Sequence, residues 1–104
     1  MKKVINGKVY DTEKAKLVHE WNNGNMPGDF KYREKKLYRT KKGNWFLHHV
    51  GGAMTDMAKP VGNNNTSGSE SIETISEEDA IGFLESHGGD EVILNYFPER
   101  VEEA

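Results

Sequence analysis

The sparse supply of large apolar side chains is the feature that most constrains how this chain can fold. Val, Ile, Leu and Phe account for 21 of the 104 residues, about a fifth, which lies at the edge of the disorder-prone range of composition. A chain of this length has room for one domain. We therefore expect residues 1–104 to form a single domain around a small core.

Cysteine is absent from the chain, which excludes disulfides, thiolate nucleophiles and thiolate metal sites. The first five residues resemble the start of a signal peptide, but Asn6-Gly7-Lys8 interrupts the apolar run after two residues. No later run approaches the roughly 18 apolar residues needed to span a membrane. We expect an unprocessed cytoplasmic protein with no membrane partner.

Charge is distributed unevenly along the chain. Residues 1–69 hold thirteen Lys and Arg against six Asp and Glu, a net charge of +7. Residues 70–104 hold eleven Asp and Glu against Arg100 alone, a net charge of −10, so the whole chain carries −3. Such a division indicates either charged partners or two halves of the molecule that attract each other.

A β-hairpin is predicted over residues 2–10. Its centre is Asn6-Gly7, a pair that tolerates positive φ at both central positions of the tight turn that matches strand twist.

A helix is predicted over residues 11–23. Asp11 or Thr12 can cap its start, and Asn22-Asn23-Gly24 supplies a positive-φ end. The apolar residues of this segment fall on one helical stripe: Ala15, Leu17, Val18 and Trp21.

Alternating side chains then predict a three-stranded meander. The three strands are expected at residues 30–33, 37–40 and 45–50. In the first strand, Phe30 and Tyr32 face one side and the cations beside them face the other. Gly43 suits the short loop between the second and third strands. Residues 51–69 are poor in apolar side chains and rich in Gly and Asn, so we expect a flexible loop there.

The sequence pattern of the C-terminal third predicts an edge strand, helices and a tail. Residues 70–75 alternate imperfectly and can add a strand at the sheet edge. Ser76 begins a helix with Asp79 at the third position, an approximate capping box. Residues 90–97 have helical spacing but strand propensities, and we favour a short helix over a strand. Residues 99–104 are expected to form a frayed acidic tail.

These elements predict an α+β fold. The hairpin and the meander are expected to share one small antiparallel sheet, covered by the N-terminal helix and by one or two C-terminal helices. The predicted core residues are Trp21, Leu37, Phe46, Phe83 and Leu84.

The doublet His48-His49 suggests a metal-dependent nuclease, because a histidine pair on a strand with later ligands outlines a ββα-metal site. Adjacent strand residues point to opposite faces, however, so one site could use only one of the two directly. Leu47 also stands where such nucleases usually have an acid. We favour one packed and one solvated histidine.

A stretch of seven cations with interleaved aromatic residues is the second candidate site. Its cations are Lys31, Arg33, Lys35, Lys36, Arg39, Lys41 and Lys42. Together with the aromatic residues of segment 30–46, they are the ingredients of a single-strand nucleic-acid platform, with cations for phosphates and rings for bases. The alternative is a solvated sheet face whose rings belong to the core on the other face.

The acids of residues 70–104 are the third candidate site. Carboxylates on helical faces can imitate the charge of a nucleic-acid backbone and occupy a basic groove of another protein. The alternative is two ordinary amphipathic surface helices. The favoured acids are Glu77, Glu78, Asp79, Glu85, Asp90 and Glu91.

Motifs typical of catalysis are absent from the sequence: it has no Gly-rich phosphate loop, no nucleophile elbow and no clustered acid pair. We therefore expect no enzymatic activity, no metal and no cofactor.

Three segments of the chain resemble a known family. They are residues 5–13 (INGKVYDTE), residues 37–48 (LYRTKKGNWFLH) with Gly51-Gly52, and residues 75–80 (ISEEDA). The family consists of small proteins carried on mobile elements of Gram-positive bacteria, and the chain is similar to members that act as type II-A anti-CRISPR proteins, which inhibit Cas9. The similarity runs over nearly the whole chain and is weakest at residues 54–69.

This resemblance implies a cytoplasmic, non-enzymatic inhibitor that binds Cas9, free or guide-bound, and keeps it from guide RNA or target DNA. The excess of acids in residues 70–104 agrees with this role, because Cas9 holds its nucleic acids in positively charged channels. A nucleic-acid-binding module that uses the basic hairpin is the second hypothesis, and a nuclease that uses His48 or His49 is the third.

Overall fold

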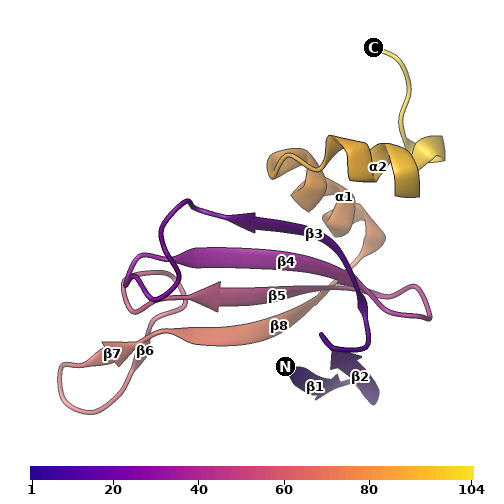
Figure 1. Ribbon diagram of the computed structural model, residues 1–104. Helices are drawn as coiled ribbons and strands as arrows, with labels where there is room; N and C mark the ends of the chain where they lie inside the picture. Colours follow the sequence, from indigo (N-terminus) through magenta and orange to yellow (C-terminus); the bar gives the residue numbers. More distant parts are fainter.

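A four-stranded antiparallel sheet with two helices on one face forms the centre of the protein (Figure 1), as seen in a computed structural model that describes all 104 residues. The strands lie in the order β3-β4-β5-β8. They are β3 (Lys16–Asn22), β4 (Arg33–Arg39), β5 (Trp45–Gly51) and β8 (Ser69–Ile75). The helices are α1 (Glu77–Ser86) and α2 (Asp90–Tyr96). The predicted α+β class is confirmed.

The predicted N-terminal hairpin is confirmed, with β1 (Lys2–Ile5) paired to β2 (Lys8–Asp11). Asn6 and Gly7 have φ of 51° and 76°, as the tight turn requires. The prediction that this hairpin shares the main sheet is wrong, because β1 and β2 form a separate two-stranded sheet. The hairpin instead packs its Tyr10 ring on the sheet face opposite α1 and α2.

The predicted helix over residues 11–23 is wrong, because most of that segment is strand β3. A β-bulge at Val18 explains the misleading spacing. Val18 and Trp21 lie three residues apart, which would place them on opposite faces of a regular strand. The extra residue of the bulge brings both onto the helix-covered face, where they pack against the core. A bulged strand therefore imitated a helical stripe.

The first predicted strand of the meander, residues 30–33, is also wrong, since β4 begins only at Arg33. A turn holds the preceding segment: the Tyr32 backbone N–H donates to the Asp29 carbonyl at 3.1 Å, and the Lys31 N–H donates to Asp29 Oδ1 at 2.7 Å. Asp side chains favour such local bonds over a strand ladder. The second strand, predicted at residues 37–40, is the end of β4, which begins four residues earlier, and the third is β5; the loop between them contains Gly43 with φ of 87°.

Residues 51–69 contain a short hairpin of β6 (Lys59–Pro60) and β7 (Thr66–Ser67). Ser69 Oγ donates to the Met57 carbonyl at 2.6 Å, which ties the base of this segment together. The flexibility of the segment stays a prediction. The edge strand expected at residues 70–75 is confirmed as β8, which pairs only with β5.

The C-terminal helices follow their local signals. Ser76 caps α1 by accepting a hydrogen bond from the Asp79 backbone N–H at 3.1 Å. The ambiguous segment 90–97 is the helix α2, followed by a 3-10 turn, η1 (Pro98–Arg100). Neither helix is long and apolar enough to cross a membrane.

Two hydrophobic clusters hold the layers together, one on each face of the sheet. The first joins the sheet to the helices and contains Leu37, Trp45, Leu47, Ala80, Phe83, Leu84, Ile93 and Phe97. The second joins the sheet to the N-terminal hairpin and contains Tyr10, Tyr38, Phe46 and Ile72. Burial of Leu37, Phe46, Phe83 and Leu84 confirms four of the predicted core residues, whereas Trp21 is only half-buried.

Candidate functional site

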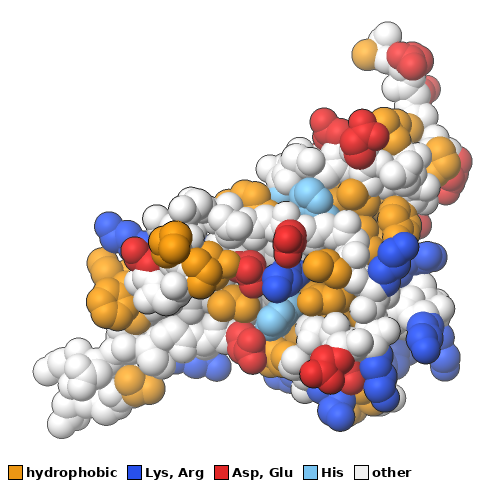
Figure 2. Space-filling view, viewed as in Figure 1, with side chains coloured by type: hydrophobic (Ala, Val, Ile, Leu, Met, Phe, Trp, Pro, Cys, Tyr) orange, Lys and Arg blue, Asp and Glu red, His pale blue; other side chains and the backbone are white.

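The acids predicted as a partner-binding surface are all exposed on α1 and α2, and we call them the acidic surface. They are Glu77, Glu78, Asp79, Glu85, Asp90 and Glu91. Figure 2 shows red side chains over α2 and the C-terminal tail at the top of the view, with blue side chains below the helices and further red side chains over the sheet. Because α1 rises about 1.5 Å per residue, Glu78 and Glu85 lie roughly 10 Å apart along its axis. The surface therefore spans the length of one helix and the start of the next.

Arg100 is the cation closest to this surface. Its Nη1 donates to Glu77 Oε2 at 3.0 Å, and its Nη2 lies 4.0 Å from Glu78 Oε1. Both contacts are solvent-exposed, where ion pairs contribute little. Five of the six acids either have no salt bridge or have only the long contact of Glu78. The surface remains strongly negative.

Part of this acid content also stabilises the helices. The first turn of α1 carries Glu77, Glu78 and Asp79, and the first turn of α2 carries Asp90 and Glu91. Negative charge near a helix N-terminus interacts favourably with the helix dipole. A structural role and a binding role are therefore both open to these five residues, whereas Glu85 lies in the last turn of α1, where the helix dipole disfavours negative charge.

The predicted basic set is not brought together by the fold. Arg33 is 8% exposed and holds Asp56 with two bonds, Nε to Oδ1 at 2.7 Å and Nη2 to Oδ2 at 3.2 Å. Its hydrogen bond holds the pKa of the Asp56 carboxyl below the usual value, although burial opposes this shift. Arg33 is therefore occupied inside the protein.

Three further cations of the set are engaged by neighbouring side chains. Lys35 lies 5.8 Å from the Trp21 ring centre, and Lys36 lies 3.6 Å from Glu34 Oε1. The Arg39 guanidinium stacks over Trp45 and Tyr96 at 5.6 and 5.9 Å. Only Lys31, Lys41 and Lys42 are exposed without an ion pair or a ring contact.

The aromatic residues of the basic stretch lie mostly in the core. Tyr32, Tyr38, Trp45 and Phe46 are buried, and only Phe30, at 67% exposed, faces solvent. Tyr32 donates its hydroxyl hydrogen to Glu34 Oε2 at 2.6 Å, a bond that raises the pKa of Tyr32 to about 12. Burial raises the pKa of Tyr38, and Lys36 opposes that shift. The rings therefore form no stacking platform for bases.

His48 and His49 point to opposite faces of the sheet, as strand alternation predicts. Each meets a different glutamate of β8: His48 Nε2 lies 3.0 Å from Glu70 and His49 Nε2 lies 2.8 Å from Glu73. Arg33 Nη2 lies 2.9 Å from His49 Nδ1. Because a guanidinium only donates, His49 Nδ1 accepts here and its Nε2–H donates to Glu73.

Ligands for a metal do not gather around either histidine. No three His, Cys, Asp or Glu side chains come together in a way that could hold a metal ion. The two histidines instead link β5 to the edge strand β8, through one hydrogen bond on each face.

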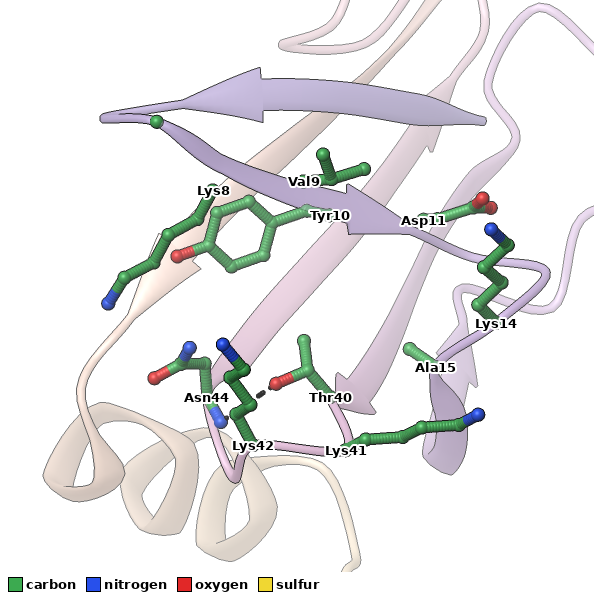
Figure 3. Close-up of a pocket in the computed structure, with 11 residues that line it drawn as sticks. Lys8, Val9, Tyr10, Asp11, Lys14, Ala15, Thr40, Lys41, Lys42 and Asn44 are labelled. Carbon is green, nitrogen blue, oxygen red and sulfur yellow. Dashed lines mark hydrogen bonds between the residues drawn. The ribbon is translucent and has the colours of Figure 1, made fainter.

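One cavity was missed by the sequence reasoning. It has a volume of about 460 Å³ and lies between the N-terminal hairpin and the loop that joins β4 to β5 (Figure 3). Lys41 and Lys42 line it together with Lys8 and Lys14, which were not among the predicted site residues. The two turn signals, Asn6-Gly7 and Gly43, were visible in the sequence, but nothing in it placed the two turns side by side.

No family model, curated protein or solved structure matches this chain.

Proposed function

We propose that this protein is an inhibitor of Cas9, of the type II-A anti-CRISPR kind, and that it binds Cas9 through the acidic surface on α1 and α2. The observation that carries the proposal is the exposure of all six acids on one pair of helices, with Arg100 as the nearest cation. The sequence resemblance supports the same role.

The physical mechanism is competition for a basic channel. Cas9 holds guide RNA and target DNA in positively charged channels. Carboxylates on a rigid helix pair present negative charge there without the entropic cost of ordering a disordered acidic tail. Complementary fields also accelerate association, an effect that salt weakens. Binding therefore competes with guide RNA loading or with target DNA binding.

The proposed inhibitor acts by occupancy and catalyses no reaction. It works in the cytoplasm of the bacterial host, where a mobile element that carries it evades the host's CRISPR defence. Purified protein incubated with guide RNA and plasmid DNA in the presence of Mg²⁺ or Mn²⁺ is expected to leave both intact. Cleavage that is lost on His48→Ala or His49→Ala would favour the nuclease hypothesis instead.

The basic hairpin is the less favoured alternative because its groups are occupied. Arg33 is paired with Asp56, and the aromatic residues, apart from Phe30, are buried. Of the seven cations in the predicted basic set, only Lys31, Lys41 and Lys42 therefore have no partner within the protein.

Co-purification tests the proposal. The tagged protein is mixed with type II-A Cas9 free of guide RNA, with the Cas9–guide complex, and with guide RNA alone, each at 50 and 500 mM NaCl. We expect retention of Cas9 at low salt, with weaker retention at high salt, and no retention of guide RNA alone. Retention of guide RNA without Cas9 would favour the nucleic-acid-binding alternative, and retention of neither would contradict both.

A further inference from the structure

A cavity lined by four lysines lies beside the N-terminal hairpin, and we call it the lysine pocket. Lys8 comes from β2, Lys14 from the turn that follows, and Lys41 and Lys42 from the loop between β4 and β5 (Figure 3). The hairpin packs on the sheet face opposite the helices. The lysine pocket is thus distinct from the acidic surface and independent of the proposed function.

None of these four ammonium groups takes part in an ion pair or a side-chain hydrogen bond within the protein. This contrasts with Arg33, Lys36 and Arg100, each of which has an acidic neighbour within 4.0 Å. All four lysines are solvent-exposed, so water and salt screen much of their mutual repulsion, and an anion in the cavity offsets what remains. No acid of the protein forms an ion pair with the lysines that line the pocket.

The one acid in the lining does not meet this demand. Asp11 Oδ1 accepts a hydrogen bond from the Glu13 backbone N–H at 2.9 Å, and the Asp11 carbonyl accepts from the N–H groups of Lys14 and Ala15 at 3.2 and 2.9 Å. Asp11 thus stabilises the turn that contains Lys14. The pocket keeps an excess of three positive charges over its single carboxylate.

An apolar wall and neutral polar groups complete the lining. The Tyr10 ring, 7% exposed, packs edge-on against Phe46 with ring centres 5.5 Å apart. This contact fixes the ring, while the Tyr10 hydroxyl makes no hydrogen bond within the chain. Thr40 Oγ1 accepts from the Asn44 backbone N–H at 3.0 Å, which shapes the loop on the other side. The side-chain amide of Asn44 is left without a protein partner.

We infer that the lysine pocket binds the phosphate groups of a nucleotide. Lysine acts as a point charge for phosphate, and the four lysines stand at different sides of the pocket (Figure 3), where flexible side chains can reach the several negative charges of a nucleoside di- or triphosphate. The volume of about 460 Å³ falls within the range of small-molecule sites. Tyr10 and Ala15 offer apolar surface to the sugar and base. We take the source of these phosphates to be a free nucleotide, in keeping with the expectation that the protein does not retain guide RNA alone.

Fluorescence anisotropy of N-methylanthraniloyl-labelled ATP, titrated with the full chain at 50 mM NaCl, tests this inference. We expect saturable binding that pyrophosphate and unlabelled ATP displace and that adenosine does not. A ten-nucleotide single strand is the second competitor: we expect it to displace the probe only at higher concentration than ATP, and displacement at lower concentration would overturn the inference.

Two matched double variants make the test specific. Lys8→Gln with Lys42→Gln removes one cation from each side of the pocket, and we expect at least tenfold weaker binding. Lys31→Gln with Lys59→Gln makes the same charge change at exposed sites outside the pocket, and we expect less than a twofold effect. No saturable binding up to 1 mM protein, displacement by adenosine, or equal weakening by both variants would overturn the inference.

Discussion

Arg33 and Asp56 are joined by two parallel hydrogen bonds, at 2.7 and 3.2 Å, although 23 residues separate them in the chain. Arg33 is buried at the start of β4, whereas the side chain of Asp56 is 71% exposed. The pair fastens the segment after β5 to the sheet. Arg33 Nη1 also donates to the carbonyls of Glu34 and Val50, so this single side chain organises one end of the fold.

Replacing Asp56 with Asn is therefore expected to destabilise the protein by about 0.5–1.5 kcal/mol at pH 7, the usual net contribution of a hydrogen bond, because the Asp56 side chain is 71% exposed and solvent screens the charged pair. The folded-state pKa of Asp56 is lowered from 3.8, so its stabilisation is fully present above that value and is lost as pH falls below it. Urea unfolding at pH 7, 5 and 3 measures this: the difference from wild type should shrink toward pH 3. Glu20→Gln, at an exposed acid without a salt bridge, serves as the control, and a difference that is independent of pH would contradict the assignment.

Replacing Tyr32 with Phe is expected to cost about 1 kcal/mol at pH 8, because it removes the hydrogen bond to Glu34. The pKa of Tyr32 is raised from 10.0 to about 12, so this stabilisation is complete below pH 10 and disappears as pH rises toward 12. Denaturant unfolding between pH 8 and 11 should show the wild-type advantage narrowing above pH 10. Tyr96→Phe, whose hydroxyl makes no hydrogen bond, should show no such trend. An advantage for Tyr32 that persists unchanged at pH 11 would speak against the bond.

Replacing Phe46 with Ala is expected to cost roughly 3–5 kcal/mol, the usual range for deleting a buried aromatic ring. Phe46 is 0% exposed, stacks on Tyr38 with ring centres 5.1 Å apart and meets Tyr10 edge-on. The loss should also release the N-terminal hairpin, seen as faster hydrogen exchange in β1 and β2. Phe30→Ala, at an exposed ring, should change stability by less than about 0.5 kcal/mol. Equal effects of the two substitutions would rule out the described packing.

Elements with strong local signals could be predicted from the sequence. Asn6-Gly7 specifies its turn by backbone conformation alone, and Ser76 specifies the start of α1 by a cap that spans three residues. β3 could not be predicted in this way, because the bulge at Val18 arises only from pairing with β4. The docking of the hairpin also depends on contacts between Tyr10 and Phe46, which lie far apart in the chain.

The candidate sites show the same difference between features set by local sequence and features set by contacts between distant segments. The acids of α1 and α2 could be placed on an exposed surface because helical periodicity separates them from Phe83 and Leu84. The basic set could not be judged, since Asp56 and Trp21, which occupy Arg33 and Lys35, come from distant segments. The lysine pocket depends on two turns that only the tertiary fold brings together. Features set by neighbouring residues could therefore be predicted from the sequence, whereas contacts between distant segments could not.

Inhibition of target cleavage by a type II-A Cas9 tests the central claim most directly, with two variants of equal charge change. The first, Glu78→Lys with Glu85→Lys and Glu91→Lys, reverses acids of the acidic surface and spares Glu77, which pairs closely with Arg100. The second, Glu99→Lys with Glu102→Lys and Glu103→Lys, reverses exposed acids at the C-terminus. Thermal unfolding is measured first, because Glu78 and Glu91 also favour their helix N-termini.

Cleavage is then measured over a range of inhibitor concentrations, with each protein added to Cas9 before the guide RNA. The account predicts that wild type and the C-terminal variant inhibit at similar concentrations, and that the folded acidic-surface variant needs at least ten times more. A folded acidic-surface variant that inhibits as well as wild type, or a wild-type protein that does not inhibit, would contradict it.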